Sequence, residues 1–289
     1  MLRAENRDQL DAVTLPWRQE GLDIALVPTM GNLHAGHLAL VEAAKQRAER
    51  VVTSIFVNPT QFGPGEDYKS YPRTLDADSA ALESAGCDLL FTPGNGTMYP
   101  YGLDRAIRLG APAGLATVLE GESRPGHFDG VITVVARLFN LVRPQLAIFG
   151  EKDYQQLLVI KHMTDDLGYG INIVPIATER EQSGLAMSSR NNYLEKTARK
   201  SAGRLYGELK DAAKLLENGS SDYLRIEKES ASRLEKMGFQ VDYVAVRRAE
   251  DLGLPGPGDR ELRLLAAVRC GQTRLIDNVG LIRVGISDL

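Results

Sequence analysis

The chain has 289 residues, of which 43% are hydrophobic and 25% are charged. This length is generous for one domain, so we expect two domains with a sizeable core. The 34 basic and 38 acidic residues give a formal net charge of −4, without a run of Lys and Arg. This charge argues against nucleic acid as a partner, because such binding needs a basic patch.

The N-terminus and the cysteines indicate where the protein acts. Residues 1–8 are too polar for a signal peptide, and no segment approaches the about 18 apolar residues of a membrane-spanning helix. We therefore expect a cytoplasmic protein without membrane contact. Cys87 and Cys270 are the only cysteines and lack a CxxC spacing, so we expect no disulfide.

Alternating strand and helix patterns predict a parallel sheet. Residues 24–27 form an apolar run typical of a buried strand, a helix follows from about His37 to residue 48, and residues 51–57 form a second strand. Further helices are expected at 76–85, 131–142 and 153–167, and further strands at 88–91, 146–149 and 171–176. The fold class is therefore α/β, a Rossmann-like doubly wound parallel sheet, with ligands at the carboxyl ends of its strands.

The pattern changes after about Thr178. Residues 195–218 and 221–237 predict two long helices, and residues 240–246, 262–268 and 273–276 predict three strands. We expect a Rossmann-like domain over residues 1–178 and a smaller C-terminal α+β domain over residues 179–289.

Two histidines flank Gly36 at the first strand-to-helix turn, which makes this turn the strongest candidate site. The amides at a helix N-terminus and the imidazole donors of His34 and His37 suit phosphate oxygens whose charge grows during transfer. We expect a nucleoside triphosphate here, although histidines are also common on protein surfaces.

Three more polar clusters follow predicted strands. Gln61 lies in a long loop, and its amide could bind a carboxylate or hydroxyl with Asn58 and Tyr71 nearby, or it could be solvated beside an Asn-Pro turn. Lys152 and Asp153 could hold phosphate oxygens and a ribose hydroxyl or metal-bound water, with Gln156 one turn on, or Asp153 could only cap a helix. Ser188, Ser189 and Arg190 could close over a polyphosphate.

A further polar segment lies before the helix expected at residue 131. Arg124 and His127 could hold a second substrate, while Asp129 could cap that helix. The sequence lacks a P-loop, a dinucleotide fingerprint, an HExxH motif and a GxSxG elbow. We therefore expect no protein metal site and no hydrolase triad.

With these motifs in order, the chain resembles the pantothenate synthetase (pantoate–β-alanine ligase) family of the HxGH nucleotidyltransferase superfamily. The resemblance covers nearly the whole chain and rests on residues 28–37, 54–64, 71–74, 119–128, 149–153, 184–191 and 273–278. It implies condensation of (R)-pantoate with β-alanine in two steps. Pantoate attacks Mg²⁺-bound ATP to give pantoyl adenylate and pyrophosphate, and β-alanine then releases AMP.

The resemblance also assigns residues. As catalytic residues it implies His37, named as the proton donor, together with His34 and Lys152. The residues expected to bind ATP are Met30, Gly31, Asn32, Leu33, His34, Ala35, Gly36, His37, Gly150, Glu151, Lys152, Asp153, Glu179, Met187, Ser188, Ser189 and Arg190. Those expected to bind pantoate are Gln61 and Gln156, and those expected to bind β-alanine are Gln61, Tyr71, Arg124 and His127.

The resemblance further implies a homodimer with ATP, pantoate and β-alanine as its small-molecule partners, Mg²⁺ entering with ATP, and the smaller domain acting as a lid. The chain departs from the family pattern at a few positions: Asn32, Ala35, Glu179, Ser183 and residues 93–98. Two rivals stay open. One is a nucleotidyltransferase that leaves a nucleotide on its product, and the other is a nucleotide-sensing module without turnover.

Overall fold

The computed structural model describes residues 1–283, which form two compact units. The first unit comprises Met1–Glu151 and Gln156–Ala177. The second comprises Lys152–Gln155 and the chain from Thr178 onward. Nothing in the residue pattern had indicated that the short segment Lys152–Gln155 would group with the C-terminal unit.

The first unit is built on a six-stranded parallel sheet in the order β1-β4-β3-β2-β5-β6. The strands are β1 (Leu2–Ala4), β2 (Ile24–Thr29), β3 (Arg50–Ile55), β4 (Leu89–Phe91), β5 (Leu146–Gly150) and β6 (Asn172–Ile176). The direction of winding reverses between the neighbours β2 and β5, which is where such sheets bind ligands. This architecture confirms the expected Rossmann-like fold.

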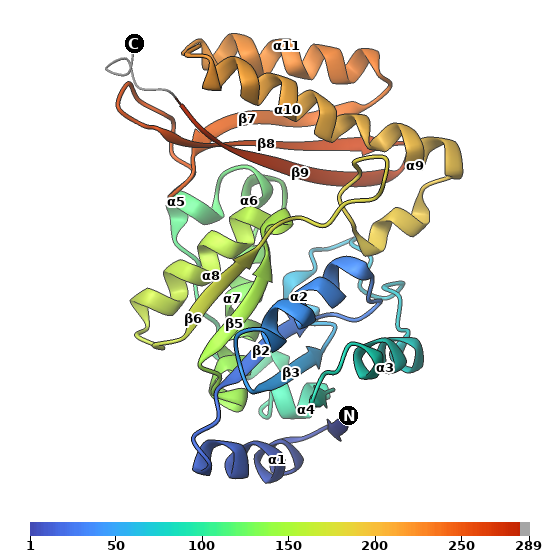
Figure 1. Ribbon diagram of the computed structural model, residues 1–289, viewed down its shortest axis with the longest axis vertical. Coiled ribbons are helices and arrows are strands. Elements are labelled where there is room, and N and C mark those ends of the chain that lie inside the picture. The colour runs from blue at the N-terminus through green and yellow to red at the C-terminus, as the bar shows by residue number, and fades with distance from the viewer. Residues whose placement is uncertain (284–289) are drawn as a thin grey trace. The chain divides into compact units, whose positions relative to one another are not determined.

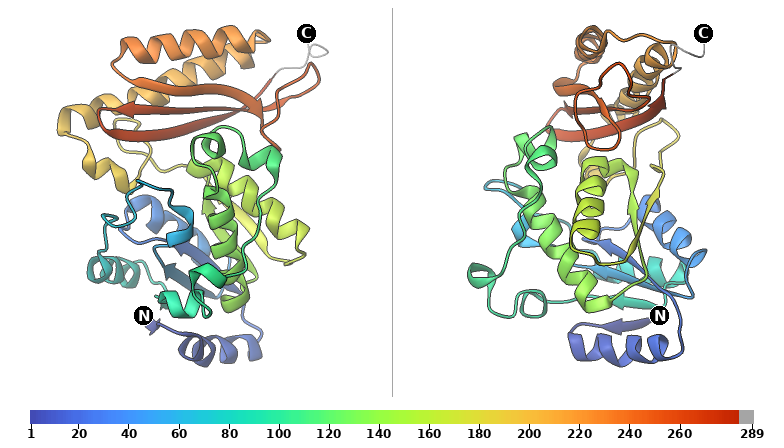
Figure 2. Two further views of the ribbon diagram at one scale, coloured as in Figure 1. Left: turned by 180° about the vertical axis from the view of Figure 1, so that it is seen from behind. Right: turned by 90° about the vertical axis from the view of Figure 1, so that its left-hand side faces the viewer.

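Helices cover both faces of this sheet (Figures 1 and 2). Its helical elements are α1 (Arg7–Gln19), α2 (Ala35–Lys45), the 3₁₀ turn η1 (Pro59–Gln61), α3 (Leu75–Ser84), α4 (Asn95–Met98), η2 (Leu103–Arg105), α5 (Ala113–Ala116), α6 (Glu120–Ser123), α7 (His127–Val142), η3 (Glu151–Asp153) and α8 (Tyr154–Asp166). Ala25 and Val27 of β2 share a core cluster with Val41 of α2. Ile24 and Leu26 are equally buried and alternate to the opposite face, and α7 also packs on β2.

Several helix boundaries differ from those expected. Helix α2 begins at Ala35, so His37 lies in its first turn and not at its start. Helix α7 begins at His127, four residues before the expected start at residue 131, because Gly126 takes a left-handed conformation (φ 78°) before it. Strand β1 and helix α1 were not predicted.

The second unit is a three-stranded antiparallel sheet, ordered β7-β8-β9, with α10 and α11 packed on it (Figure 1). Its elements are η4 (Ser189–Tyr193), α9 (Lys196–Ala202), α10 (Arg204–Glu217), α11 (Tyr223–Lys236), β7 (Gln240–Arg248), β8 (Glu261–Cys270) and β9 (Thr273–Ile282). The single helix expected over residues 195–218 is broken at Gly203. A Cβ atom at Gly203 would lie 2.1 Å from the carbonyl oxygen of Ser183, so only glycine fits this contact.

Both cysteines are free thiols, and Cys87 is buried. Among residues 1–283, no helix combines the length and apolar character needed to cross a bilayer.

Candidate active site

The turn after β2 is held by a buried carboxylate. Asp78 of α3 accepts hydrogen bonds from the backbone N–H of Asn32 at 2.9 Å and of Leu33 at 2.8 Å, and from the Thr74 hydroxyl at 3.1 Å. Gly31 has φ 84°, and a Cβ atom there would lie 3.1 Å from Asp78 Oδ2. Asp78 therefore fixes the path of the chain into the histidine turn. The sequence showed Asp78 only as one of several acidic residues in a helix.

The two histidines lie together at the N-terminus of α2. His34 is the N-cap residue, and its backbone N–H donates to His37 Nδ1 at 3.3 Å. The ring centroids are 4.0 Å apart. Because Nδ1 of His37 accepts, a neutral His37 carries its proton on Nε2, where it is a donor. Both rings thus lie beside the first amides of a helix, a position suited to a phosphate group.

Gln61, at the end of η1, is oriented by a buried asparagine. Asn58 Nδ2 donates to Gln61 Oε1 at 3.1 Å and to the carbonyl oxygen of Gly130 at 3.1 Å. Asn58 Oδ1 in turn accepts from the Tyr99 hydroxyl at 2.6 Å. These contacts turn the Gln61 amide nitrogen toward Met30, whose sulfur lies 3.2 Å away. The structure therefore brings together a residue expected at ATP and one expected at pantoate.

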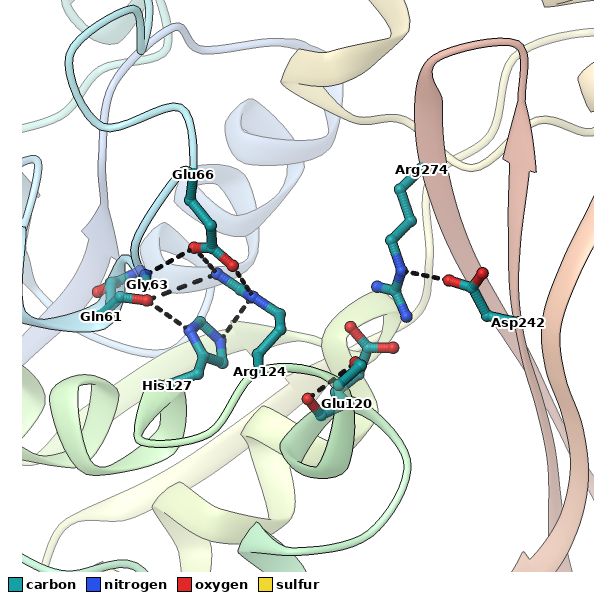
Figure 3. Close-up of polar contacts among 9 residues, drawn as sticks. Gln61, Gly63, Glu66, Glu120, Arg124, His127, Asp242 and Arg274 are labelled. Carbon is teal, nitrogen blue, oxygen red and sulfur yellow. Dashed lines mark hydrogen bonds and ion pairs between the residues drawn. The ribbon is translucent and has the colours of Figure 1, made fainter.

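Arg124 and His127 lie next to the Gln61 backbone (Figure 3). Arg124 binds Glu66 and also contacts His127 at 2.9 Å. Burial and the positive charge of Arg124 lower the pKa of His127 from 6.5 to about 4. Burial alone would raise the pKa of Glu66, but the hydrogen bonds and charge of Arg124 hold it below its usual value. Tyr71 is buried, and its ring lies edge-on to Phe62, next in the chain to Gln61.

The segment after β5 is bound by the second unit's sheet. The backbone carbonyl of Lys152 accepts a hydrogen bond from Asn278 Nδ2 at 3.0 Å, and Arg263 Nε donates to Asn278 Oδ1 at 2.7 Å. The Arg263 guanidinium lies 3.8 Å from the centroid of the Tyr154 ring. The Lys152 side chain is 19% exposed, and its ammonium lies 3.6 Å from Asp153.

A hairpin turn carries the remaining residues expected at ATP. The backbone N–H of Met187 donates to the carbonyl of Glu179 at 2.9 Å, and the Ser188 hydroxyl accepts from the N–H of Arg190 at 3.3 Å. Arg180, beside Glu179, makes a two-point ion pair with Asp277 at 2.6 and 2.9 Å. Asp277 and Asn278 on β9 therefore organise both the hairpin and the Lys152 segment.

The expected site residues fall into two groups. Residues 30–37, Gln61, Tyr71, Gly150, Glu151, Arg124, His127 and Gln156 belong to the first unit, and Lys152, Asp153, Glu179 and residues 187–190 belong to the second. Asn58 was expected near Gln61, whereas Asp78, Asp277 and Asn278 were not expected to support the site. Within the part of the chain that the structure describes, no three His, Cys, Asp or Glu side chains gather as metal ligands.

Comparisons with known proteins agree with this arrangement. Residues 3–280 match the family model of pantoate-beta-alanine ligase. A pantothenate synthetase of Thioalkalivibrio sulfidiphilus is 53% identical over 279 residues, covering 96% of this chain and 97% of that protein. One from Neisseria meningitidis serogroup C is 51% identical over 263 residues, covering 91% and 94%.

Solved structures lead to the same family. The pantothenate synthetase of Thermus thermophilus superposes with a TM-score of 0.88 at 46% identity, covering 96% of this chain and 99% of that one. The pantoate-beta-alanine ligase of Francisella tularensis, in complex with beta-gamma ATP and beta-alanine, has a TM-score of 0.81 at 34% identity, covering 96% and 97%. The chain therefore belongs to the pantoate-beta-alanine ligase family of ATP-dependent enzymes.

Proposed function

We propose that this chain condenses (R)-pantoate with β-alanine through a pantoyl-adenylate intermediate. The single observation that carries the proposal is the family match over residues 3–280. The local geometry supports it, because the first turn of α2 sets His34 and His37 beside helix amides, a position that suits phosphate oxygens whose charge grows during adenylation.

In the first step a pantoate carboxylate oxygen attacks the α-phosphorus of Mg²⁺-bound ATP, and the bond to the pyrophosphate oxygen breaks. Charge grows on the phosphate oxygens as this bond breaks. His37 Nε2–H, together with His34 and the ammonium of Lys152, is assigned to stabilise that charge. Mg²⁺ enters as part of the nucleotide substrate. The remaining contacts to ATP are assigned to residues 30–36, Gly150, Glu151, Asp153, Glu179 and residues 187–190.

In the second step the amine of β-alanine attacks the acyl carbon of the adenylate, an amide bond forms, and AMP leaves with the bonding electrons. Gln61 and Gln156 are assigned to pantoate. Gln61 is also assigned to β-alanine, with Tyr71, Arg124 and His127 as its neighbours. The acyl adenylate needs protection from water until the amine arrives. We assign this protection to the C-terminal unit, acting as a lid.

We further propose a homodimer in the cytoplasm. Light scattering on the purified chain measures the oligomeric state, and fractionation of the source cells measures the location.

The experiment for the reaction uses the purified protein, Mg²⁺ and pantoate labelled with ¹⁸O in its carboxylate. Pyrophosphate is expected to form with ATP and pantoate alone, whereas free AMP is expected only after β-alanine is added. One ¹⁸O atom should then be found in AMP, because the adenylate bond passes through a pantoate oxygen. AMP without the label contradicts an acyl-adenylate, and a nucleotide left on the amide product favours the nucleotidyltransferase rival.

A further inference from the structure

A closed ring of hydrogen bonds surrounds the backbone at Gln61 (Figure 3). His127 Nδ1 lies 2.8 Å from the Gln61 carbonyl oxygen, and Arg124 Nη1 lies 2.9 Å from His127 Nε2. An arginine N–H only donates, so Nε2 accepts and the proton of His127 resides on Nδ1. His127 therefore donates to the Gln61 carbonyl as a neutral ring.

Glu66 completes the ring from the other side. Both of its carboxylate oxygens accept from Arg124 at 2.7 Å, and one also accepts from the backbone N–H of Gly63 at 3.2 Å. The path thus runs from the Gln61 carbonyl through His127, Arg124 and Glu66 to the amide of Gly63. It fixes the chain at the end of η1 at two points, one at each end of a three-residue stretch.

The Gln61 side chain depends on this backbone position. Its Oε1 is already bound by Asn58, which also binds the carbonyl of Gly130 in the first turns of α7. Helix α7 starts at His127, so the same helix supplies the backbone contact and the surface against which η1 packs. A shift of the Gln61 backbone would therefore break the contact with Asn58 and turn the amide away from Met30.

The charges within the ring are satisfied internally. Three different nitrogen atoms of Arg124 are engaged by Glu66, His127 and, at 3.5 Å, the Gln61 carbonyl. Four of the five N–H groups of Arg124 are thus used, so a two-point contact between Arg124 and a substrate carboxylate would have to displace one of these partners. The geometry favours a fixed ion pair between Arg124 and Glu66 that supports His127 and the Gln61 backbone.

We infer that Glu66, Arg124 and His127 are positioning residues that hold the Gln61 amide in place for the hydroxy-acid substrate, an inference that rests on the proposed function. They act through the backbone of Gln61, and this role replaces the direct contact with β-alanine that the family resemblance implies for Arg124 and His127. Loss of the ring should weaken the acid substrate's binding while nucleotide binding, which uses the turn after β2, is retained.

The test compares His127→Ala with His127→Asn, because an asparagine amide N–H occupies the position of Nδ1–H and restores the donor to the Gln61 carbonyl. Pyrophosphate release is measured at steady state with ATP, pantoate and saturating β-alanine, because without β-alanine the bound adenylate permits a single turnover and defines no KM. We expect His127→Ala to raise the KM for pantoate about tenfold, the effect of one hydrogen bond, with the KM for ATP within about twofold. His127→Asn should recover most of this loss. His162→Ala, at an exposed position on α8, is the matched control.

A second measurement does not require turnover. Hydrogen exchange of the backbone amides at residues 58–66 is followed without substrates, and we expect exchange about tenfold faster in His127→Ala than in His127→Asn or the control. Unchanged exchange overturns the inference. If the parent protein releases no pyrophosphate with pantoate, the proposed function fails and the exchange result still decides whether the ring holds η1.

Three kinetic results would also overturn the inference. A raised KM for β-alanine with pantoate-dependent pyrophosphate release unchanged would mean that His127 contacts the amine substrate. A lower kcat with unchanged KM values and a lower Tm would mean that it only supports the fold. Failure of His127→Asn to recover pantoate binding would show that the hydrogen bond from residue 127 to the Gln61 carbonyl does not control the binding of pantoate.

Discussion

Gly130 is the position at which a single methyl group tests how tightly η1 is held against α7. A Cβ atom at Gly130 would lie 2.3 Å from the carbonyl oxygen of Thr60 and 2.6 Å from both the N and Cα atoms of Gln61. Real Cβ atoms essentially never approach other atoms within 3.0 Å, so the helix and the turn must separate by about 1 Å. All three obstructing atoms belong to backbone and have no alternative rotamer.

The expected size of the effect follows from two opposing contributions. Replacing a helical glycine by alanine favours the helix by about 1 kcal/mol, whereas forcing apart a packed contact costs about 1–3 kcal/mol or more. Because all three obstructing atoms are backbone, the cost lies at the upper end of this range, and we expect Gly130→Ala to lower the free energy of unfolding by about 2 kcal/mol. Because the displaced atoms include those of Gln61, the KM for pantoate should rise as well.

Urea unfolding followed by tryptophan fluorescence measures this change. Trp17 is the only tryptophan and lies on α1, so its emission reports the unit that contains Gly130. Gly96→Ala is the matched control, because Gly96 lies in a helix of the same unit with no atom within 4 Å of the added Cβ. If Gly130→Ala is as stable as the control, η1 can move away from α7 without a cost in free energy, and the backbone of Gln61 is not held by this contact.

Three further predictions concern the histidine turn and the ring at Gln61. Replacing His37 with Ala should reduce pyrophosphate release by about two to three orders of magnitude, as loss of a preorganised donor does, and a single-turnover rate within about threefold of the parent would mean that His37 has another role. Asp78→Asn should lower the free energy of unfolding of the first unit by about 2 kcal/mol and reduce ATP-dependent activity, because one backbone N–H then faces an amide donor. Asp76→Asn, at an exposed position in the same helix, should leave the free energy of unfolding and the activity unchanged. For His127, which faces Arg124, Glu66 and Glu120, the folded pKa of about 4 lies below the ordinary 6.5, so the unfolded chain takes up the proton first as the pH falls. The neutral His127 ring therefore contributes about 3 kcal/mol to the free energy of unfolding, which is fully present above pH 6.5 and is lost as the pH falls toward 4. The free energy of unfolding of His127→Asn should fall less than that of the parent protein between pH 6.5 and pH 4. Equal falls in the two proteins would contradict a neutral, buried ring.

Much of the fold could be predicted because buried parallel strands are continuous apolar runs. The runs at residues 24–27, 51–57 and 146–149 all became neighbouring strands of one sheet. Strand β1 and helix α1 were missed because β1 has only three residues and α1 contains Pro16. The break at Gly203 was missed because it depends on a contact with Ser183, twenty residues earlier in the chain.

The supporting residues of the site were less accessible to prediction. Asp78 is 46 positions from the Asn32 amide that it binds, and Asn278 is 126 positions from Lys152. Such partners are brought together only by the completed fold, and their residue types alone suggest a helix surface or a strand. The histidine pair could be found because both of its members lie within one turn of helix, so sequence spacing already fixes their separation.

The grouping of Lys152–Gln155 with the C-terminal unit has a consequence for dissecting the protein. The chain crosses from one unit to the other three times, after Glu151, Gln155 and Ala177. A fragment that stops at Ala177 retains Lys152 and Tyr154 but loses Asn278, Arg263 and Ala249, to which they are bound. No single cut therefore yields two self-sufficient pieces, and exchange of the C-terminal part between relatives requires this four-residue insert to be matched along with it.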